Sequence, residues 1–370
     1  MSTTPPPSTT APVALFGVGD VARQLVQKPP ILLGLILEVL PPLYLVVYGR
    51  GSAAGVVTLA ILCSQMATLL GGFKVGSINA LIFSVLLATC CLASGQPVAA
   101  GALALAIALW ASLGVASGKG TLITMSASIM TLQVMVPPVV AHTASASSWR
   151  NVGQVFAYAL VASVWGVLIA LMLRRGRTIP SIPGASWTWG ITQGLLVGGV
   201  MAVVAAVATW RHLGQGGAWL LMTTFLVFKP LTPTPWRRSL NRALGTMLGV
   251  LIVATYLKTL PATAPSTAVL IPGTLMLAAA ALTIISQRWP YWCFVAVLTP
   301  GIVLLFACMT GSSKAVDLAR HLDSLRFEYS LLGIAIALLM QAILTGITNV
   351  FHLETNGLMG HQARRDPGGA

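Results

Sequence analysis

The chain has 370 residues, of which 56% are hydrophobic and only 8% are charged. Soluble domains carry about 25% charged residues, and a mean hydropathy of +0.87 leaves too few polar side chains to cover a globule of this size. An ordinary soluble protein is therefore excluded. The net charge of +14 does not indicate nucleic-acid binding, because the Lys and Arg residues lie between apolar runs, where the positive-inside rule places them.

The chain begins with a polar segment and continues into six apolar runs. Residues 1–30 lack the basic and apolar pattern of a signal peptide, so we expect a cytoplasmic tail with a short amphipathic stretch. The region 31–173 then holds runs close to the roughly 20 residues that span a bilayer. They lie at 31–48, 51–72, 77–96, 97–117, 121–141 and 152–173.

A basic linker at 174–186 separates this half from a second one at 187–348. The second half contains apolar runs at 187–210, 217–231, 240–258, 266–286, 291–311 and 327–348, and a tail at 349–370 ends the sequence. The pattern predicts an all-α membrane protein with about 12 transmembrane helices in two six-helix halves.

The distribution of basic residues predicts the topology. With the N-terminus inside, fourteen Lys and Arg residues lie in inside segments and seven in outside segments. Both termini and the linker are therefore expected in the cytoplasm, in a multi-pass protein of the inner membrane. Because each half has an even number of helices, the halves would be parallel repeats related by an axis along the membrane normal.

Two pairs of features match between the halves. The fifth run of the first half carries Pro137 and Pro138, and the fifth run of the second half carries Pro300 and Gly301. Arg150 and Arg326 each precede a sixth run. Matching helix breaks would point to a substrate site near the repeat interface. The alternative is two unrelated proline kinks.

The second half carries the most distinctive motif. Gly217-Ala-Trp-Leu-Leu leads to Phe228-Lys-Pro, and Arg242-x-x-Gly245-Thr246-x-x-Gly249 then opens an apolar run. Leu298-Thr299-Pro300 and Arg326, followed by Leu331-Leu332-Gly333, stand farther on. This stretch, about 187–348, resembles the fusaric acid resistance (FUSC) family, which includes aromatic acid exporters, and it is also similar to the plant malate channels.

The resemblance implies an integral-membrane transporter of small organic anions, with periplasmic adaptor proteins as candidate partners. The large cytoplasmic domains frequent in the family are absent from this sequence. In the first half, Lys74 and Asn79 stand where the arginine–glycine motif would fall.

Substrate binding is expected around the start of the ninth run. Free N–H groups at a helix N-terminus attract anions, and arginine forks match carboxylates. Arg237, Arg238 and Arg242 would gather an organic acid at the cytoplasmic mouth, with Thr246 beside them. Arg237 and Arg238 could equally serve only to set topology. Thr299 and Arg326 complete the expected substrate-binding set.

Glu38 is the carboxylate found in the middle of an apolar run. A charge there is costly, so such residues usually face a cavity or a partner. We expect Glu38 to be a proton-coupling group. The alternatives are a structural partner for a Lys or Arg, or a helix break at Pro41-Pro42 that brings Glu38 nearer the surface.

The sequence therefore predicts a proton-coupled exporter of aromatic or other organic acids, as a monomer or a homo-oligomer. A passive anion channel and a membrane subunit of an envelope assembly remain open. We expect no enzyme, cofactor or metal site, because the histidines have no ligand spacing and no phosphate-binding loop occurs.

Overall fold

The computed structural model describes residues 29–118, 120–141, 145–173, 186–228, 235–261, 264–286, 290–309 and 315–350, and within these ranges every regular element is a helix. The predicted tails and basic linker lie almost entirely outside the described residues. In the first half the helices are α2 (Pro29–Val47), α3 (Gly51–Leu92), α4 (Pro97–Ala116), α5 (Gly120–Met135) and α6 (Trp149–Leu173).

Helix α3 accounts for two of the predicted runs because it folds back on itself. Its arms, Gly51–Leu69 and Gly71–Leu92, meet at Gly72, whose φ of 84° favours glycine. The Asn79 Nδ2 donates to the Cys63 carbonyl over 3.3 Å. Residues 16 apart in one straight helix would be about 24 Å apart, so this bond requires a tight hairpin.

The second half contains α7 (Trp187–Trp210), α8 (Gly214–Val227), α9 (Pro235–Thr259), α10 (Thr267–Ser286), α11 (Tyr291–Met309) and α12 (Ala315–Val350). Helix α12 starts twelve residues before the predicted run at 327. Its first turn carries Asp317, a favourable charge at a helix N-terminus. The charged residues just before 327, which the sequence pattern placed in a loop, are therefore part of the helix.

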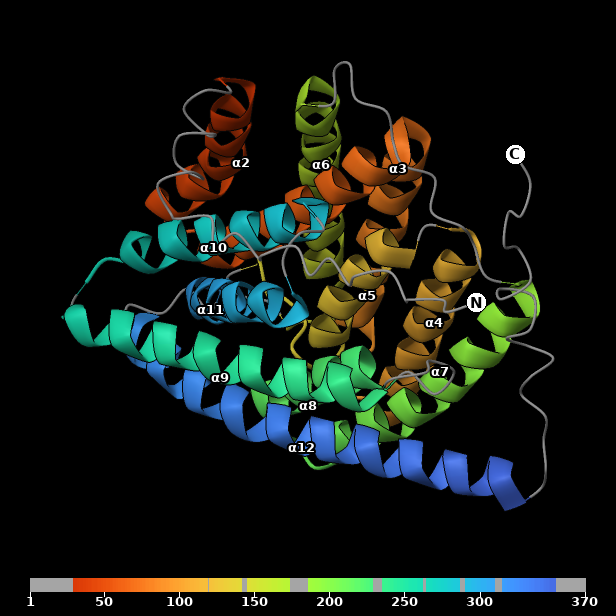
Figure 1. The fold of residues 1–370 in the computed structure, drawn as a ribbon. Coiled ribbons are helices and arrows are strands. Elements are labelled where there is room, and N and C mark those ends of the chain that lie inside the picture. Colours follow the sequence, from red (N-terminus) through yellow and green to blue (C-terminus); the bar gives the residue numbers. More distant parts are fainter. Residues whose placement is uncertain are drawn as a thin grey trace, which may run out of the picture.

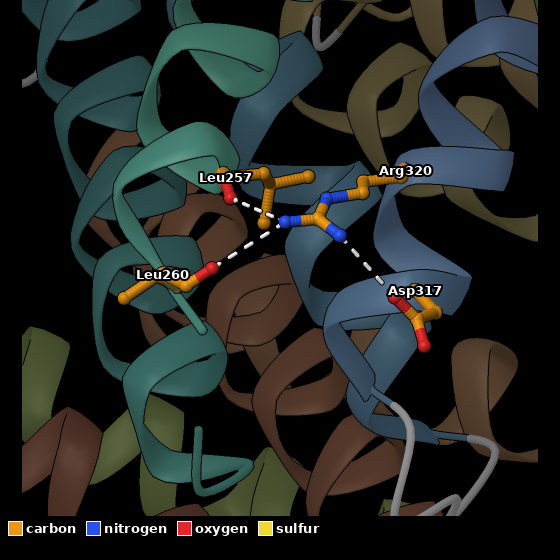
Figure 2. A network of polar contacts seen from close by, with 4 residues as sticks. All are labelled: Leu257, Leu260, Asp317 and Arg320. Atoms are coloured by element: carbon orange, nitrogen blue, oxygen red, sulfur yellow. Dashed lines mark hydrogen bonds and ion pairs between the residues drawn. The ribbon is translucent and has the colours of Figure 1, made fainter. Parts of the chain in front are cut away.

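Arg320 joins the start of α12 to the end of α9 (Figure 2). Its Nη2 donates to the carbonyl oxygens of Leu257 and Leu260, over 3.0 and 3.4 Å, and its Nη1 contacts Asp317 Oδ1 at 3.3 Å. The last carbonyls of a helix have no partner within it, so Arg320 caps α9. A basic residue predicted to lie in an outside loop is a structural cap.

Four helical segments form the centre of the molecule: the first arm of α3, α5, α8 and α11. Helix α5 packs on α8, and α11 packs on α3. From Gly216 to Phe228, every residue of α8 and its C-cap is buried. A helix that is apolar all round is expected in such a position.

The remaining helices surround this centre, and glycines allow the closest contacts. Helix α7 places Gly190, Gly194 and Gly198 against α4, where added Cβ atoms would meet Ala116, Leu109 and Leu105. This contact links the two halves. Figure 1 shows that the long helices α9 and α12 of the second half run crosswise to α2 and α6 of the first.

The predicted helix break at Pro300 and Gly301 is wrong, so the two halves do not share matching breaks. Helix α5 ends at Met135, before Pro137 and Pro138, whereas α11 continues through Pro300 and Gly301. A proline inside a membrane helix is tolerated where neighbouring groups compensate the lost hydrogen bond. The predicted equivalence of Arg150 and Arg326 also fails, since Arg150 is exposed at the start of α6 and Arg326 is buried well inside α12.

One buried side chain, Asn151, holds the described residues that follow α5. Its Oδ1 accepts from the backbone N–H groups of Val140 and Ala141, at 2.7 and 3.1 Å. Its Nδ2 donates to the carbonyls of Pro138 and Ala146, both at 3.0 Å. All of the amide's bonding capacity is used on one segment, so Asn151 specifies the path of the chain there.

Among the described residues, seven helical stretches are long and apolar enough to cross a membrane. They are Gly51–Leu69, Gly71–Leu92, Pro97–Ala116, Trp149–Leu173, Trp187–Trp210, Ser239–Thr259 and Val316–Ile343. Shorter apolar stretches lie in α2, α5, α10 and α11. The chain is thus an all-helical, multi-pass membrane protein.

Candidate functional site

Two arginines predicted from the motif lie inside the second half. Arg242 is in the second turn of α9, Arg326 is the twelfth of the 36 residues of α12, and both side chains are 0% exposed. The two guanidinium groups are close enough to repel one another. The structure therefore brings together two positive charges that are 84 residues apart in the sequence.

Arg326 lies against an aromatic pair on the central helices. Its guanidinium carbon lies 4.4 Å from the centre of the Trp219 ring, and Trp219 in turn packs on Phe306 with ring centres 5.5 Å apart. A guanidinium stacked on a desolvated indole gains about 2 kcal/mol. The only further contact of its Nη1 is to Met222 Sδ at 3.9 Å, so the aromatic face fixes the position of Arg326 in the described structure.

Asp323 lies one turn before Arg326 on the same face of α12. Its side chain is 5% exposed, and it attracts Arg326 electrostatically. Asp317 and Glu328, the other described acidic residues of the second half, are exposed. Within the described part of this half, two buried arginines are thus accompanied by one buried carboxylate.

Thr246 and Thr299 are buried residues of α9 and α11, two helices that pack against each other. A Cβ added at Gly245 would meet Val295 Cβ at 2.5 Å, and one added at Gly249 would meet Thr299 Cβ at 2.6 Å. The glycines of the motif therefore bring the two helices into close contact. This contact places Thr246, adjacent to Gly245, on the same helix pair as Thr299.

Several polar atoms on α8, α9, α11 and α12 are buried and have no hydrogen-bond partner among the described residues. Such groups are rare in native proteins and call for an explanation. These atoms are Arg326 Nε and Nη2, Trp219 Nε1, Thr246 Oγ1, Thr299 Oγ1 and Asp323 Oδ1. We call their residues the arginine site and include in it the buried Arg242, which is not one of the groups without a partner. The set is rich in donors and carries an excess of positive charge, as an anion requires.

The three arginines predicted at the start of α9 are described to different extents. Arg242 was expected to gather an anion at the cytoplasmic mouth, and the structure adds that its side chain is fully buried. Arg237 and Arg238 lie in the first turn of α9, and their side chains fall outside the described residues.

Glu38 lies in the other half, away from the arginine site. Its side chain is 2% exposed, Gln65 of α3 is its hydrogen-bonding neighbour, and its Oε1 has no partner in the described structure. Helix α2 does not break at Pro41 and Pro42 but continues to Val47. Glu38 is therefore not brought to the surface by a helix end.

The continuity of α2 has a local explanation. Pro41 has no N–H to donate to the carbonyl of Leu37, its partner in a regular helix. The Trp165 Nε1 of α6 donates to that carbonyl instead, over 2.9 Å. The interhelical bond replaces the missing one, so the double proline is compatible with a continuous α2.

Two residues of the arginine site were not identified from the sequence. Trp219 stood within the quoted Gly-Ala-Trp-Leu-Leu motif but resembled any apolar residue of a buried helix. Asp323 was assigned to a loop before the sixth run. Its spacing of three residues from Arg326 was the available signal, because residues i and i+3 share a helix face.

Buried polar groups converging from separate apolar helices are typical of membrane proteins that bind or move a polar solute. Residues 190–340 match the family model described as fusaric acid resistance protein-like. The match covers less than half of the chain; it supports the resemblance seen in the sequence and, with it, a membrane transport or efflux-related role. No curated protein and no solved structure matches the chain.

Proposed function

We propose that this protein exports small organic acids, aromatic acids among them, across the inner membrane, and that a proton gradient drives the export. The observation that carries the proposal is the meeting of Arg242 and Arg326 inside the second half. Buried like charges are unfavourable unless an anion compensates them, and an arginine fork pairs with a carboxylate through two parallel bonds.

The other members of the arginine site support an organic rather than a simple inorganic anion. The threonine hydroxyls and the indole N–H can donate to carboxylate or hydroxyl oxygens of a substrate. The rings of Trp219 and Phe306 offer an apolar surface to the rest of the molecule. Arg237 and Arg238, at the start of α9, would attract the anion from the cytoplasm.

Proton coupling is proposed at Glu38. A carboxylate in an apolar environment is more stable when neutral, so a change at this site can add or release a proton. The groups facing it from α3 include Gln65, which is uncharged. The only described Lys and Arg of α3 and α6, Lys74 and Arg150, are exposed.

We also propose that the halves are parallel repeats. Counting the arms of α3 separately, the packing of α4 on α7 corresponds to that of α10 on α2, and the packing of α5 on α8 to that of α11 on α3. Because the corresponding helices α6 and α12 run crosswise (Figure 1), each would be strongly tilted. The 28-residue apolar stretch of α12 is about 42 Å long, enough to span about 30 Å while tilted.

The test is salicylate flux in proteoliposomes with and without a proton gradient, for wild type, Glu38→Gln and the matched control Glu328→Gln. Glu328 is exposed on α12, so its variant should match wild type. Gradient-driven flux that is lost only in Glu38→Gln supports the exporter. Flux that ignores both the gradient and Glu38→Gln favours a passive anion channel. Absence of flux counts against independent export and favours a subunit that needs periplasmic adaptor partners.

A further inference from the structure

We propose that Asp323 is an internal counter-ion of the arginine site. An anion that binds Arg326 replaces Asp323 as its counter-ion, and Asp323 then takes up a proton. This inference rests on the proposed function and adds a positioning residue to it. Asp323 would make anion binding and proton binding depend on each other at the arginine site itself, independently of Glu38.

The first step is the location of Asp323. It lies three residues before Arg326, on the face of α12 that also contains Ser330, which is bonded to Thr223 of α8. That face packs on α8 and α9. Asp323 is 5% exposed, and its Oδ1 has no hydrogen-bond partner among the described residues. Its charged form is therefore stabilised mainly by the nearby arginine.

The second step is the absence of a competing role for this carboxylate within the described residues. Arg320, the other arginine one turn away, is bonded to Asp317 and to carbonyls of α9 (Figure 2). Among the described side chains, α8 has no titratable group, and α11 contributes Tyr291 and Cys293. Helix α9 contributes Arg242, the partly buried Tyr256, which is bonded to the Ala268 carbonyl, and the exposed Lys258. On α12 itself, His321 and Glu328 are exposed, and the partly buried Tyr329 lies against Gly216 of α8. Arg326 is the group to which Asp323 is electrostatically coupled.

The third step is the balance of charge. Without a bound anion, Asp323 compensates part of the charge of Arg326. When a carboxylate binds Arg326, it introduces a second negative charge beside Asp323 in a buried environment. Arg326 is the arginine to which Asp323 is coupled, and it can compensate only one of the two carboxylates, so the other is more stable when it binds a proton. Anion binding should then consume a proton, and it should be tighter at lower pH.

The experiment is calorimetric titration of the full-length protein in detergent with salicylate, in two buffers of different ionisation enthalpy at one pH. The difference between the buffers gives the protons taken up per bound anion. We expect up to about one proton for wild type, no uptake for Asp323→Asn, and about tenfold tighter binding by this variant because a repulsive charge is removed. Asp317→Asn is the matched control, since it makes the same change at an exposed site on α12, and it should behave as wild type.

Proton uptake by Asp323→Asn equal to that of wild type would overturn the proposal, as would salicylate binding to wild type without proton uptake. The same titration with nitrate separates the two proposals, because nitrate needs only the positive charge. Nitrate binding with proton uptake that depends on Asp323, but no salicylate binding, would uphold the role of Asp323 and count against organic-acid export. Failure of both anions to bind would overturn both.

Discussion

At the scale of single residues, environment rather than residue type separates the arginines of this protein. Arg320 caps a helix, Arg150 is exposed, and Arg326 lies fully buried on an indole ring. Only the last combines burial with donors that have no partner in the described structure. The contact with Trp219 is therefore the point at which the arginine site can be tested most directly.

We expect Trp219→Leu to reduce anion binding or flux about tenfold or more, because the variant removes a desolvated cation–π contact worth about 2 kcal/mol. Trp219→Phe keeps an aromatic face and should lose less. Salicylate flux in proteoliposomes measures both variants. The control is Trp210→Leu, which removes an exposed indole that lies 5.8 Å from Arg211. Equal losses in Trp219→Leu and Trp210→Leu would contradict a specific role for Trp219.

Asn151 allows a second prediction at this scale. In Asn151→Asp the side chain can no longer donate to the carbonyls of Pro138 and Ala146, and a carboxylate would face both oxygens. Leaving buried polar groups unsatisfied costs about 1 to 3 kcal/mol, and more when a charge is involved. We expect a clear fall in the thermal unfolding temperature in detergent. Gln154→Glu, the same change at a half-buried site on α6, should lower it much less.

At the scale of helices, close packing depends on glycines at specific contacts. The Gly245 and Gly249 pair of α9 lies directly against α11, with Thr299 and Val295 as neighbours. The spacing by itself indicates close approach of some helix. Which helix approaches, and that the contact borders the arginine site, follows only from the packing.

We expect Gly249→Val to destabilise the protein by about 1 to 3 kcal/mol, the usual cost of overpacking, and to impair flux by separating α9 from α11. Gly199→Val in α7 is the control, because an added Cβ there meets no atom within 4 Å. Thermal unfolding followed by tryptophan fluorescence compares the two. If Gly199→Val unfolds at as low a temperature as Gly249→Val, the loss of a glycine rather than the α9–α11 contact causes the destabilisation.

At the scale of the whole molecule, the hairpin of α3 fixes how the first half crosses the membrane. The arm Gly71–Leu92 has 22 residues and is about 33 Å long, close to the thickness of the hydrocarbon core. Lys74 and Gln96 are exposed near its opposite ends. They should therefore lie on opposite sides of the membrane.

With cytoplasmic termini, Gln96→Cys should react with a membrane-impermeant maleimide in intact spheroplasts, and Lys74→Cys should react only after permeabilisation. Wild type measures the background, because the described cysteines are buried. The reverse pattern would invert the proposed topology. Reaction of both variants in intact spheroplasts would contradict the membrane crossing of this arm.

The sequence alone determined the membrane class, the approximate position of each apolar helix and the family motif. These features follow from composition and from runs of apolar residues, which record the local requirement of a bilayer for apolar surface. The motif also gave Arg242 and Arg326 as candidates. The sequence did not show which helices and side chains contact one another, because residues far apart in the chain meet only through packing.

The tertiary structure therefore decided the rest. Gly72 turns what could be one long helix into a hairpin, and Trp165 keeps α2 continuous across two prolines. The early start of α12 moves Asp323 and Arg326 from an expected loop into the interior. Burial and long-range proximity set the energetic cost of a charge, and neither can be read from a linear pattern. For this reason Trp219 and Asp323 became visible as parts of the arginine site only in the folded chain.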